Sequence, residues 1–232
     1  VLGSRGLGDV YKRQMNEYSL VVEFGCANGR LLRRIESVTD KNITKLVGFD
    51  INEEIIMIAK NISPEITFTS KWDEVLTLLK HTPKKSLIIF SSVWHEISQE
   101  YYETIFNEMK KFTTIVIRDM KAPIKGAEPI DAPTRDRIKK MVPEWQFNEF
   151  EEKWGRIDNK KTLYRFLLMY TYLDNWDNEI NEDYFSTPWS EINWALEKDY
   201  DVIYLNSYTL EYKKDAIAKM LSLIHISEPT RP

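Results

Sequence analysis

Short runs of apolar, often β-branched residues alternate along the chain from Leu20 with stretches in which apolar residues recur every three or four positions. Runs of the first kind are typical of strands, and stretches of the second kind are typical of amphipathic helices. Strands that alternate with helices build βαβ units, whose right-handed crossovers place helices on both faces of a parallel sheet. The sequence therefore predicts a doubly wound, mostly parallel α/β fold, with strands over 20–24, 45–50, 66–70, 86–93 and 113–120.

The helices between these strands are predicted from their apolar faces. Ser98 is a suitable N-cap for the fourth helix, and the apolar run over 86–93 indicates a central strand that is buried on both faces. The side chains expected to face the core are Leu31, Leu32 and Ile35 in the first helix, Ile55, Ile58, Ala59 and Ile62 in the second, Trp72, Val75, Leu76 and Leu79 in the third, and Tyr102, Ile105, Phe106 and Met109 in the fourth.

The pattern changes after Met120. A proline-rich loop over 121–133 precedes several helical stretches, and Thr187 and Pro188 are expected to begin the last of them as N-cap and first-turn proline. We interpret 121–198 as a helical insertion after the fifth strand, which caps the site within a single domain spanning 15–221. Residues 201–210 are predicted to form a sixth strand.

The two ends of the chain differ from the rest. Residues 1–14 and 222–232 resemble translated sequencing-adapter tails of metagenomic reading frames, so we exclude them from the functional argument. The alternative is that both segments are flexible natural termini.

Composition narrows the classes of function. Hydrophobic residues make up 43% and charged residues 29% of the chain, which is ordinary for a folded globular protein. The net charge of −4 and the absence of long Lys/Arg runs argue against binding to duplex nucleic acid. The single cysteine, Cys26, suits a reducing compartment, and no apolar run is long enough to span a membrane. We expect a cytoplasmic monomer or homodimer.

The turn after the first strand reads E-F-G-C-A-N-G over 23–29. In open parallel sheets the turn at the carboxyl end of a strand faces the ligand crevice. Gly25 permits a sharp turn and a close approach of ligand, and Gly29 lets the next helix begin near the strand. Ala27 and Arg30 break the G-x-G-x-x-G spacing of dinucleotide sites, so we expect a ligand with a cationic or zwitterionic tail and no phosphate.

E-x-G-x-x-x-G at this position resembles the first motif of class I methyltransferases, whose loop wraps the methionine part of S-adenosylmethionine. The resemblance covers 20–120 and implies that S-adenosylmethionine is the cofactor and S-adenosylhomocysteine the product. It further implies a sheet of spatial order 3-2-1-4-5-7-6. Because the chain runs into the adapter-like tail, we expect 222–227 to stand in for the seventh strand. The implied cofactor-binding residues are Glu23, Gly25, Cys26, Ala27, Asn28, Gly29, Asp50, Ile51, Trp72, Asp73, Ser91 and Ser92.

Within this set, Asp50 closes the second strand and is expected to accept hydrogen bonds from both ribose hydroxyls. NAD sites share such an acid, so Asp50 alone indicates a nucleoside ligand. Asp73 is expected to accept from the adenine amine and Trp72 to stack on the ring. The alternatives are an ordinary strand–helix turn at 23–29, a helix-terminal acid at Asp50 and a core aromatic at Trp72.

The fourth strand ends in S-S-V-W-H-E-I over 91–97, which in the resembled family faces the transferable methyl group. His95 is the candidate general base, and Glu96 is expected to orient it or to bind a substrate amine. Arg118 and Asp119 at the end of the fifth strand are expected to hold a charged substrate group. Two alternatives are a metal site formed by His95, Glu96 and Asp119, which we do not favour, and simple helix capping and local ion pairing.

The sequence therefore predicts an S-adenosylmethionine-dependent methyltransferase that acts on a small-molecule or nucleotide-like acceptor. Single-stranded nucleic acid or tRNA remains open as an acceptor. A second hypothesis is a non-catalytic module that binds S-adenosylmethionine. An NAD-dependent oxidoreductase is disfavoured by the glycine spacing.

Overall fold

The computed structural model describes residues 17–40, 42, 44–82, 85–119, 128–170, 173–182 and 187–205. The chain divides into two compact units, 1–120 and 121–232. This division falls where the alternation of strands and helices ends in the sequence.

The first unit contains a sheet of five parallel strands in the order β3-β2-β1-β4-β5. This order is the first part of the one expected from the sequence, and the predicted doubly wound α/β fold is confirmed. β2, β1 and β4 are the inner strands, and the apolar runs of β1 and β4 are buried, as predicted for 86–93. The strands are β1 (Tyr18–Phe24), β2 (Lys45–Phe49), β3 (Thr67–Thr69), β4 (Lys85–Ser91) and β5 (Thr114–Arg118).

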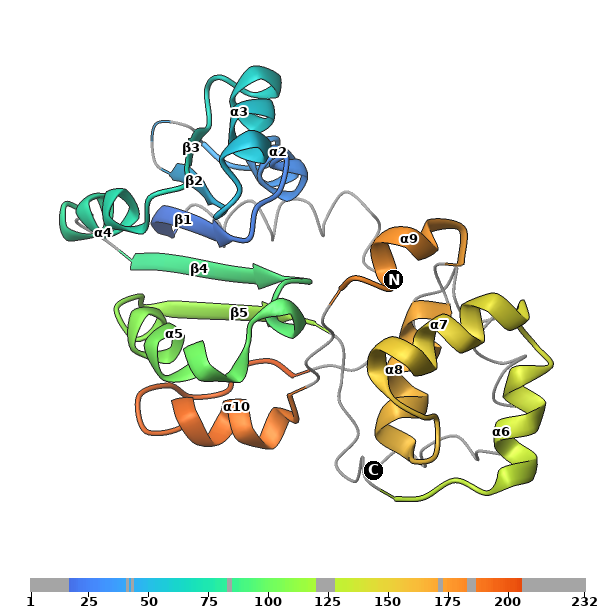
Figure 1. The fold of residues 1–232 in the computed structure, drawn as a ribbon. Helices are drawn as coiled ribbons and strands as arrows, with labels where there is room; N and C mark the ends of the chain where they lie inside the picture. Colours follow the sequence, from blue (N-terminus) through green and yellow to red (C-terminus); the bar gives the residue numbers. More distant parts are fainter. Residues whose placement is uncertain are drawn as a thin grey trace, which may run out of the picture. The chain divides into compact units, whose positions relative to one another are not determined.

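Helices cover both faces of this sheet. On one face, Val21, Leu46 and Leu87 pack with buried residues of α2 and α3, which lie beside β2 and β3 in Figure 1. On the other face, the rings of Phe24 and Phe49 contact Trp72, at the start of α4. The connecting elements are α2 (Arg30–Glu36), α3 (Glu53–Ile62), α4 (Trp72–Lys80), the short 3₁₀ turns η1 (Trp94–Glu96) and η2 (Gln99–Tyr101), and α5 (Tyr102–Met109).

The buried face of α3 differs from the prediction. Ile56 and Ala59 are the buried residues of this helix, whereas Ile58 and Ile62 are each 51% exposed. The segment carries apolar residues on more than one face, so a spacing of three and four fits two different faces. The other three predicted helix faces are buried or half-buried as expected. Ser98 precedes the turn η2, and its side chain makes no capping hydrogen bond.

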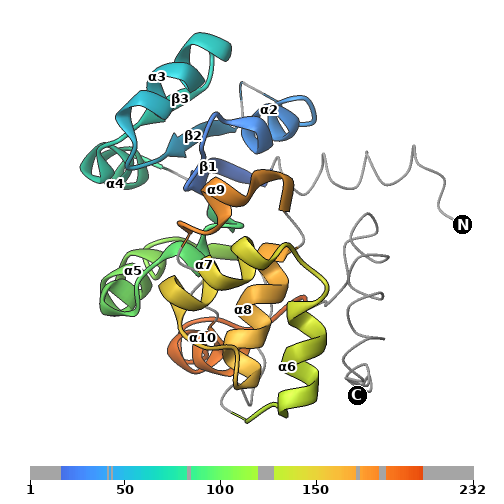
Figure 2. The same cartoon turned by 45° about the vertical axis from the view of Figure 1, so that its right-hand side comes forward.

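The second unit is helical in most of its described part. Its helices are α6 (Ala132–Lys139), α7 (Glu144–Trp154), α8 (Lys160–Tyr170), η3 (Leu173–Asn175), α9 (Trp176–Glu179) and α10 (Trp189–Leu196). Figure 2 shows α6, α7 and α8 side by side. The rings of Phe147 and Phe150 in α7 contact the ring of Phe166 in α8 edge to face, with centroid distances of 6.0 and 5.0 Å. Arg135 of α6 forms an ion pair with Glu151 of α7.

Two local predictions for this unit are wrong. Pro188 occupies the N-cap position of α10 and Trp189 begins the helix, so the predicted boundary is one residue early. Residues 201–205 form no strand, and Val202, Ile203, Tyr204 and Leu205 are exposed. The rest of the predicted sixth strand, the segment 222–227 and both adapter-like tails lie outside the described residues. Among the helices that are described, none combines the length and apolar character needed to cross a membrane.

Candidate functional site

The turn after β1 depends on backbone that favours glycine. Gly25, Ala27 and Gly29 all have positive φ, at 68°, 44° and 76°. A Cβ on Gly25 would lie 2.4 Å from Cγ2 of Val93, so Gly25 admits the side chain of Val93 there, rather than the ligand expected from the sequence. A Cβ on Gly29 would lie 2.5 Å from Cζ of Phe68, in β3. Both glycines therefore serve close packing as well as the turn.

Hydrogen bonds fix this turn against the end of β2. The N–H of Cys26 donates to the Phe49 carbonyl at 3.0 Å, and the N–H of Ala27 donates to Asp50 Oδ2 at 2.9 Å. Asp50 Oδ1 accepts from the N–H of Asn52 at 3.0 Å. Each carboxylate oxygen has a second lone pair, so Asp50, which is half-buried, keeps acceptor capacity for a ligand. The sequence places Asp50 correctly at the end of β2 but does not indicate its bond to the turn.

Glu23 lies beneath the same turn. Its side chain is buried, with only 4% of the residue exposed. Burial raises the pKa of Glu23 to about 8, while a hydrogen bond from the Leu32 backbone lowers it and the charge of Asp50 raises it. Among the described residues, Glu23 Oε2 has no hydrogen-bond partner. A buried carboxyl oxygen without a partner marks a place where a ligand group can supply a hydrogen bond.

Cys26 is a packing residue. It is 3% exposed, and burial raises the pKa of its thiol to about 12, so the thiol stays protonated at neutral pH. Asn28, the last loop residue before Gly29, is exposed, and its carbonyl accepts from Arg33 Nη1 at 2.7 Å.

The structure separates the two residues expected to contact adenine. Trp72 is half-buried, and its Nε1–H donates to Glu108 Oε2 at 2.7 Å. Together with Ile51, which is 83% exposed, Trp72 lines a cavity of about 190 Å³. Asp73 instead lines a groove of about 400 Å³ beside β3, with Lys45 and Thr69. Trp72 therefore has the contacts of a core aromatic, while Ile51 presents an apolar side chain next to Asp50.

The carboxyl ends of β4 and β5 are joined at Ser92. This serine has a positive φ of 57°, and its N–H donates to the Arg118 carbonyl at 2.8 Å. Arg118 Nη1 donates back to Ser92 Oγ at 3.3 Å. Ser91, the last residue of β4, is half-buried and pairs with Arg118 in the strand register. Ser91, Ser92 and Arg118 thus lie together.

Asp119 lies inside the structure, against His95. Its Oδ1 is 2.7 Å from His95 Nδ1, and its Oδ2 accepts from the N–H groups of Trp94 at 2.6 Å and His95 at 3.2 Å. The side chains of His95 and Asp119 are only 9% and 7% exposed. Asp119 therefore holds His95 in place, whereas the sequence suggested that it would hold a charged substrate group.

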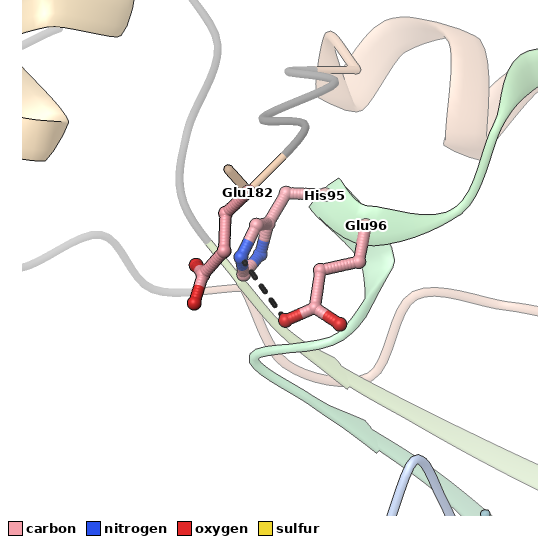
Figure 3. Close-up of side chains that lie close together, drawn as sticks. All are labelled: His95, Glu96 and Glu182. Carbon is pink, nitrogen blue, oxygen red and sulfur yellow. Dashed lines mark ion pairs between the residues drawn. The ribbon is translucent and has the colours of Figure 1, made fainter. Parts of the chain in front are cut away.

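Glu96 belongs to the same turn as His95, η1. Figure 3 shows the two side chains leaving this turn, with Glu96 Oε1 3.8 Å from His95 Nε2. The Glu96 side chain is 51% exposed, so its carboxylate remains in contact with solvent. The sequence suggested that Glu96 orients His95 or binds a substrate amine. The shorter contact of the His95 ring is the one to Asp119 Oδ1, at 2.7 Å.

Sequence reasoning missed two residues of this region. Val93 packs against Gly25, and its place within the segment 91–97 was the available signal. Asn52 caps α3, accepting from the N–H groups of Glu54 and Ile55 at 3.0 and 3.2 Å. An Asn directly before an apolar helical pattern is a recognisable N-cap signal.

No protein-family model and no curated protein matches this sequence. Among solved structures, the chain is similar to an S-adenosylmethionine-dependent methyltransferase from Mesorhizobium loti, with 14% identity, 92% of this chain and 90% of that chain covered, and a TM-score of 0.49. It is also similar to a mycolic acid cyclopropane synthase complexed with SAH and CTAB, with 11% identity, 96% and 68% covered, and a TM-score of 0.49. A Pyrococcus horikoshii protein is 16% identical, with 47% of this chain and 54% of that chain covered, at a TM-score of 0.35. The chain thus spans about half the length of that protein. At such identities the likeness concerns the fold alone.

Proposed function

We propose that this protein is an S-adenosylmethionine-dependent methyltransferase. One observation supports the proposal above all: the N–H of Ala27, in the E-x-G-x-x-x-G turn, donates to Oδ2 of Asp50 at the end of β2. This hydrogen bond holds the loop next to the carboxylate, at the carboxyl edge of a parallel sheet.

The residues present fit the cofactor. Glu23 Oε2 lacks a donor among the described residues, and the ammonium group of a methionine moiety is such a donor. Asp50 keeps lone pairs for ribose hydroxyls. Ile51 offers an exposed apolar side chain for the adenine ring. We assign Cys26, Ala27 and Asn28 to the loop around the methionine part, and Ser91 and Ser92 to the edge that faces it.

A dinucleotide fits this turn less well. Pyrophosphate binding requires several main-chain N–H groups at a helix N-terminus to point at the ligand. Here the N–H of Ala27 is bonded to Asp50, and the N–H of Gly29 is bonded to the Cys26 carbonyl at 2.8 Å. The buried Glu23 beneath the turn, once ionised, would also repel a pyrophosphate.

When bound, the cofactor supplies an electrophilic methyl group and leaves as a neutral thioether. The chain then has to align the acceptor and remove its proton, since displacement at carbon needs little else from the protein. We assign proton removal to His95, which is fixed at the end of β4 by Asp119. Glu96, half-exposed beside His95 Nε2, is assigned to an acceptor hydroxyl or amine. Arg118 is exposed at the end of β5 and is assigned to a negatively charged acceptor group.

The acceptor that we propose is a small molecule or a nucleotide-like compound. The net charge of −4 disfavours a long duplex, whereas single-stranded nucleic acid and tRNA are tested as acceptors in the same screen. A non-catalytic module that binds S-adenosylmethionine is the second candidate, because the cofactor residues do not depend on His95.

Calorimetry of the full chain with S-adenosylmethionine, S-adenosylhomocysteine and NAD tests the cofactor. We expect the first two to bind at one site and NAD not to bind. Binding of NAD without S-adenosylmethionine contradicts the proposal. Transfer of a labelled methyl group into small hydroxyl and amine compounds, nucleotides and tRNA then separates an enzyme from a binding module. Loss of transfer in His95→Gln, with unchanged cofactor affinity, is the result expected for a base.

A further inference from the structure

The buried carboxylate of Asp119 divides its two oxygens between backbone and side chain. Oδ2 accepts the N–H groups of Trp94 and His95, and Oδ1 lies 2.7 Å from His95 Nδ1. The backbone bonds fix the carboxylate, and the fixed carboxylate then fixes the ring. Residues 24 or 25 positions apart in the sequence meet in this way because β4 and β5 are adjacent parallel strands.

An ionised carboxylate only accepts hydrogen bonds, so the contact at 2.7 Å requires a proton on His95 Nδ1. In the neutral imidazole the other nitrogen, Nε2, then carries the lone pair. We infer that Asp119 is the positioning residue that holds His95 in the Nδ1–H tautomer and so makes Nε2 the proton acceptor of the reaction. This inference rests on the methyltransferase function proposed above.

The proton balance of the reaction follows from this arrangement. The acceptor oxygen or nitrogen forms its bond to the methyl carbon while the carbon–sulfur bond breaks and its electron pair stays on sulfur. The acceptor proton moves to His95 Nε2, giving an imidazolium. Asp119 at Nδ1 and Glu96, 3.8 Å from Nε2, are both placed to stabilise that positive charge.

The isosteric variant Asp119→Asn tests the tautomer directly. The amide oxygen is expected to stay on the two backbone N–H groups, which turns the amide NH₂ towards His95 Nδ1. Nδ1 then has to accept a hydrogen bond from this amide, so the ring proton moves to Nε2. Nε2 thereby loses the lone pair with which it would take the acceptor proton. Nitrogen NMR of the ring distinguishes the two tautomers without any acceptor. Signals of His95 are assigned by their loss in His95→Gln, because the chain has only three histidines.

We expect the wild-type ring to be Nδ1–H and the Asp119→Asn ring to be Nε2–H, with Glu96→Gln as a control that keeps the wild-type tautomer. With any acceptor found in the methyl-transfer screen, Asp119→Asn is expected to lower kcat about 1,000- to 10,000-fold, as when a catalytic histidine is held in the wrong tautomer. Cofactor affinity is expected to stay unchanged.

A wild-type ring protonated at Nε2 overturns the inference, and this holds even if Asp119→Asn fails to fold. An unchanged tautomer in folded Asp119→Asn also overturns it. Failure of the proposed function gives a different result, since S-adenosylmethionine then does not bind although the tautomer of His95 changes as expected.

Discussion

The backbone N–H of Ala27 donates to Asp50 Oδ2 at 2.9 Å, and this bond ties the turn after β1 to the end of β2. The other oxygen of Asp50 accepts from Asn52, whose own side chain caps α3. One carboxylate thus links a loop, a strand and a helix, and it is also the group that we assign to the ribose.

Asp50→Ala is expected to lower both stability and cofactor affinity. The hydrogen bonds from the N–H groups of Ala27 and Asn52 are lost. The loss of each bond lowers the free energy of unfolding by no more than about 1–3 kcal/mol. We expect the affinity for S-adenosylmethionine to fall at least about tenfold, because a charge-assisted bond to the sugar is removed as well. Urea unfolding and calorimetry measure the two effects separately.

Asn52→Ala is the matched control for this variant. It removes the cap of α3 and costs about 0.5–2 kcal/mol of unfolding free energy, but it leaves the carboxylate of Asp50 in place. Its cofactor affinity is therefore expected to match that of the wild type. Equal affinities in Asp50→Ala and Asn52→Ala would remove Asp50 from the binding site.

Gly25→Ala is expected to destabilise the first unit by roughly 2–5 kcal/mol, from the strain of a positive φ together with overpacking. The added Cβ would lie 2.4 Å from Cγ2 of Val93. Removing the γ carbons in Gly25→Ala/Val93→Ala is expected to restore part of the loss beyond the sum of the single variants. A double-mutant cycle of urea midpoints measures this coupling, and strictly additive effects would contradict the packing of Val93 on Gly25.

Glu23 gives the protein a predictable pH dependence. Because the pKa of Glu23 in the folded protein is about 8 and its ordinary value is 4.5, the folded state keeps a proton that the unfolded chain releases. The contribution of Glu23 to the free energy of unfolding is complete below pH 4.5. It is lost as pH rises through about 8, by up to about 1.4 kcal/mol per pH unit. The Glu23→Gln variant has no titrating carboxyl at this position. The wild type should therefore lose stability relative to this variant between pH 4.5 and about 8. Urea unfolding of both proteins at several pH values measures the difference, and parallel curves would contradict the raised pKa of the buried Glu23 carboxyl.

Ile51→Ala and Ile58→Ala form a matched pair. Both side chains are more than half exposed, at 83% and 51%, so each truncation is expected to change the unfolding free energy by less than about 0.5 kcal/mol. Only Ile51 adjoins Asp50, so only Ile51→Ala is expected to weaken binding of S-adenosylmethionine, about three- to tenfold for loss of buried apolar area. Calorimetry compares the two variants, and equal affinities would rule out contact of Ile51 with adenine.

The sheet was predictable because its strands are short apolar runs, which are buried on both faces in β1, β2 and β4. Each predicted strand lies within two residues of the observed bounds at both ends. The face of α3 was not predictable, since Ile55, Ile56, Ile58 and Ile62 offer two overlapping apolar faces and only tertiary packing chooses between them. Residues 202–205 are apolar, and Val202 and Ile203 are β-branched, yet without neighbouring strand partners in the described part they form no strand.

The candidate site was predictable at the level of residue types and strand ends. Spacing placed Glu23, Gly25 and Gly29 in one turn and His95 near Asp119. It did not reveal which oxygen of Asp119 meets which nitrogen of His95, since that depends on the register of β4 with β5. Nor did it reveal the contact of Val93 with Gly25, because the contact depends on a side-chain position across two strands.

The lone oxygen of Glu23 has a practical consequence for identifying ligands. The free-energy cost of burying ionised Glu23 grows as pH rises, and a bound cation at this oxygen offsets that cost. A compound whose cation keeps its charge at pH 9 should therefore raise the melting temperature more at pH 9 than at pH 6. Neutral compounds bound elsewhere protect equally at both. Melting curves recorded at pH 6 and pH 9 therefore distinguish compounds that bind beside Glu23 from compounds that bind elsewhere, before any reaction has been observed.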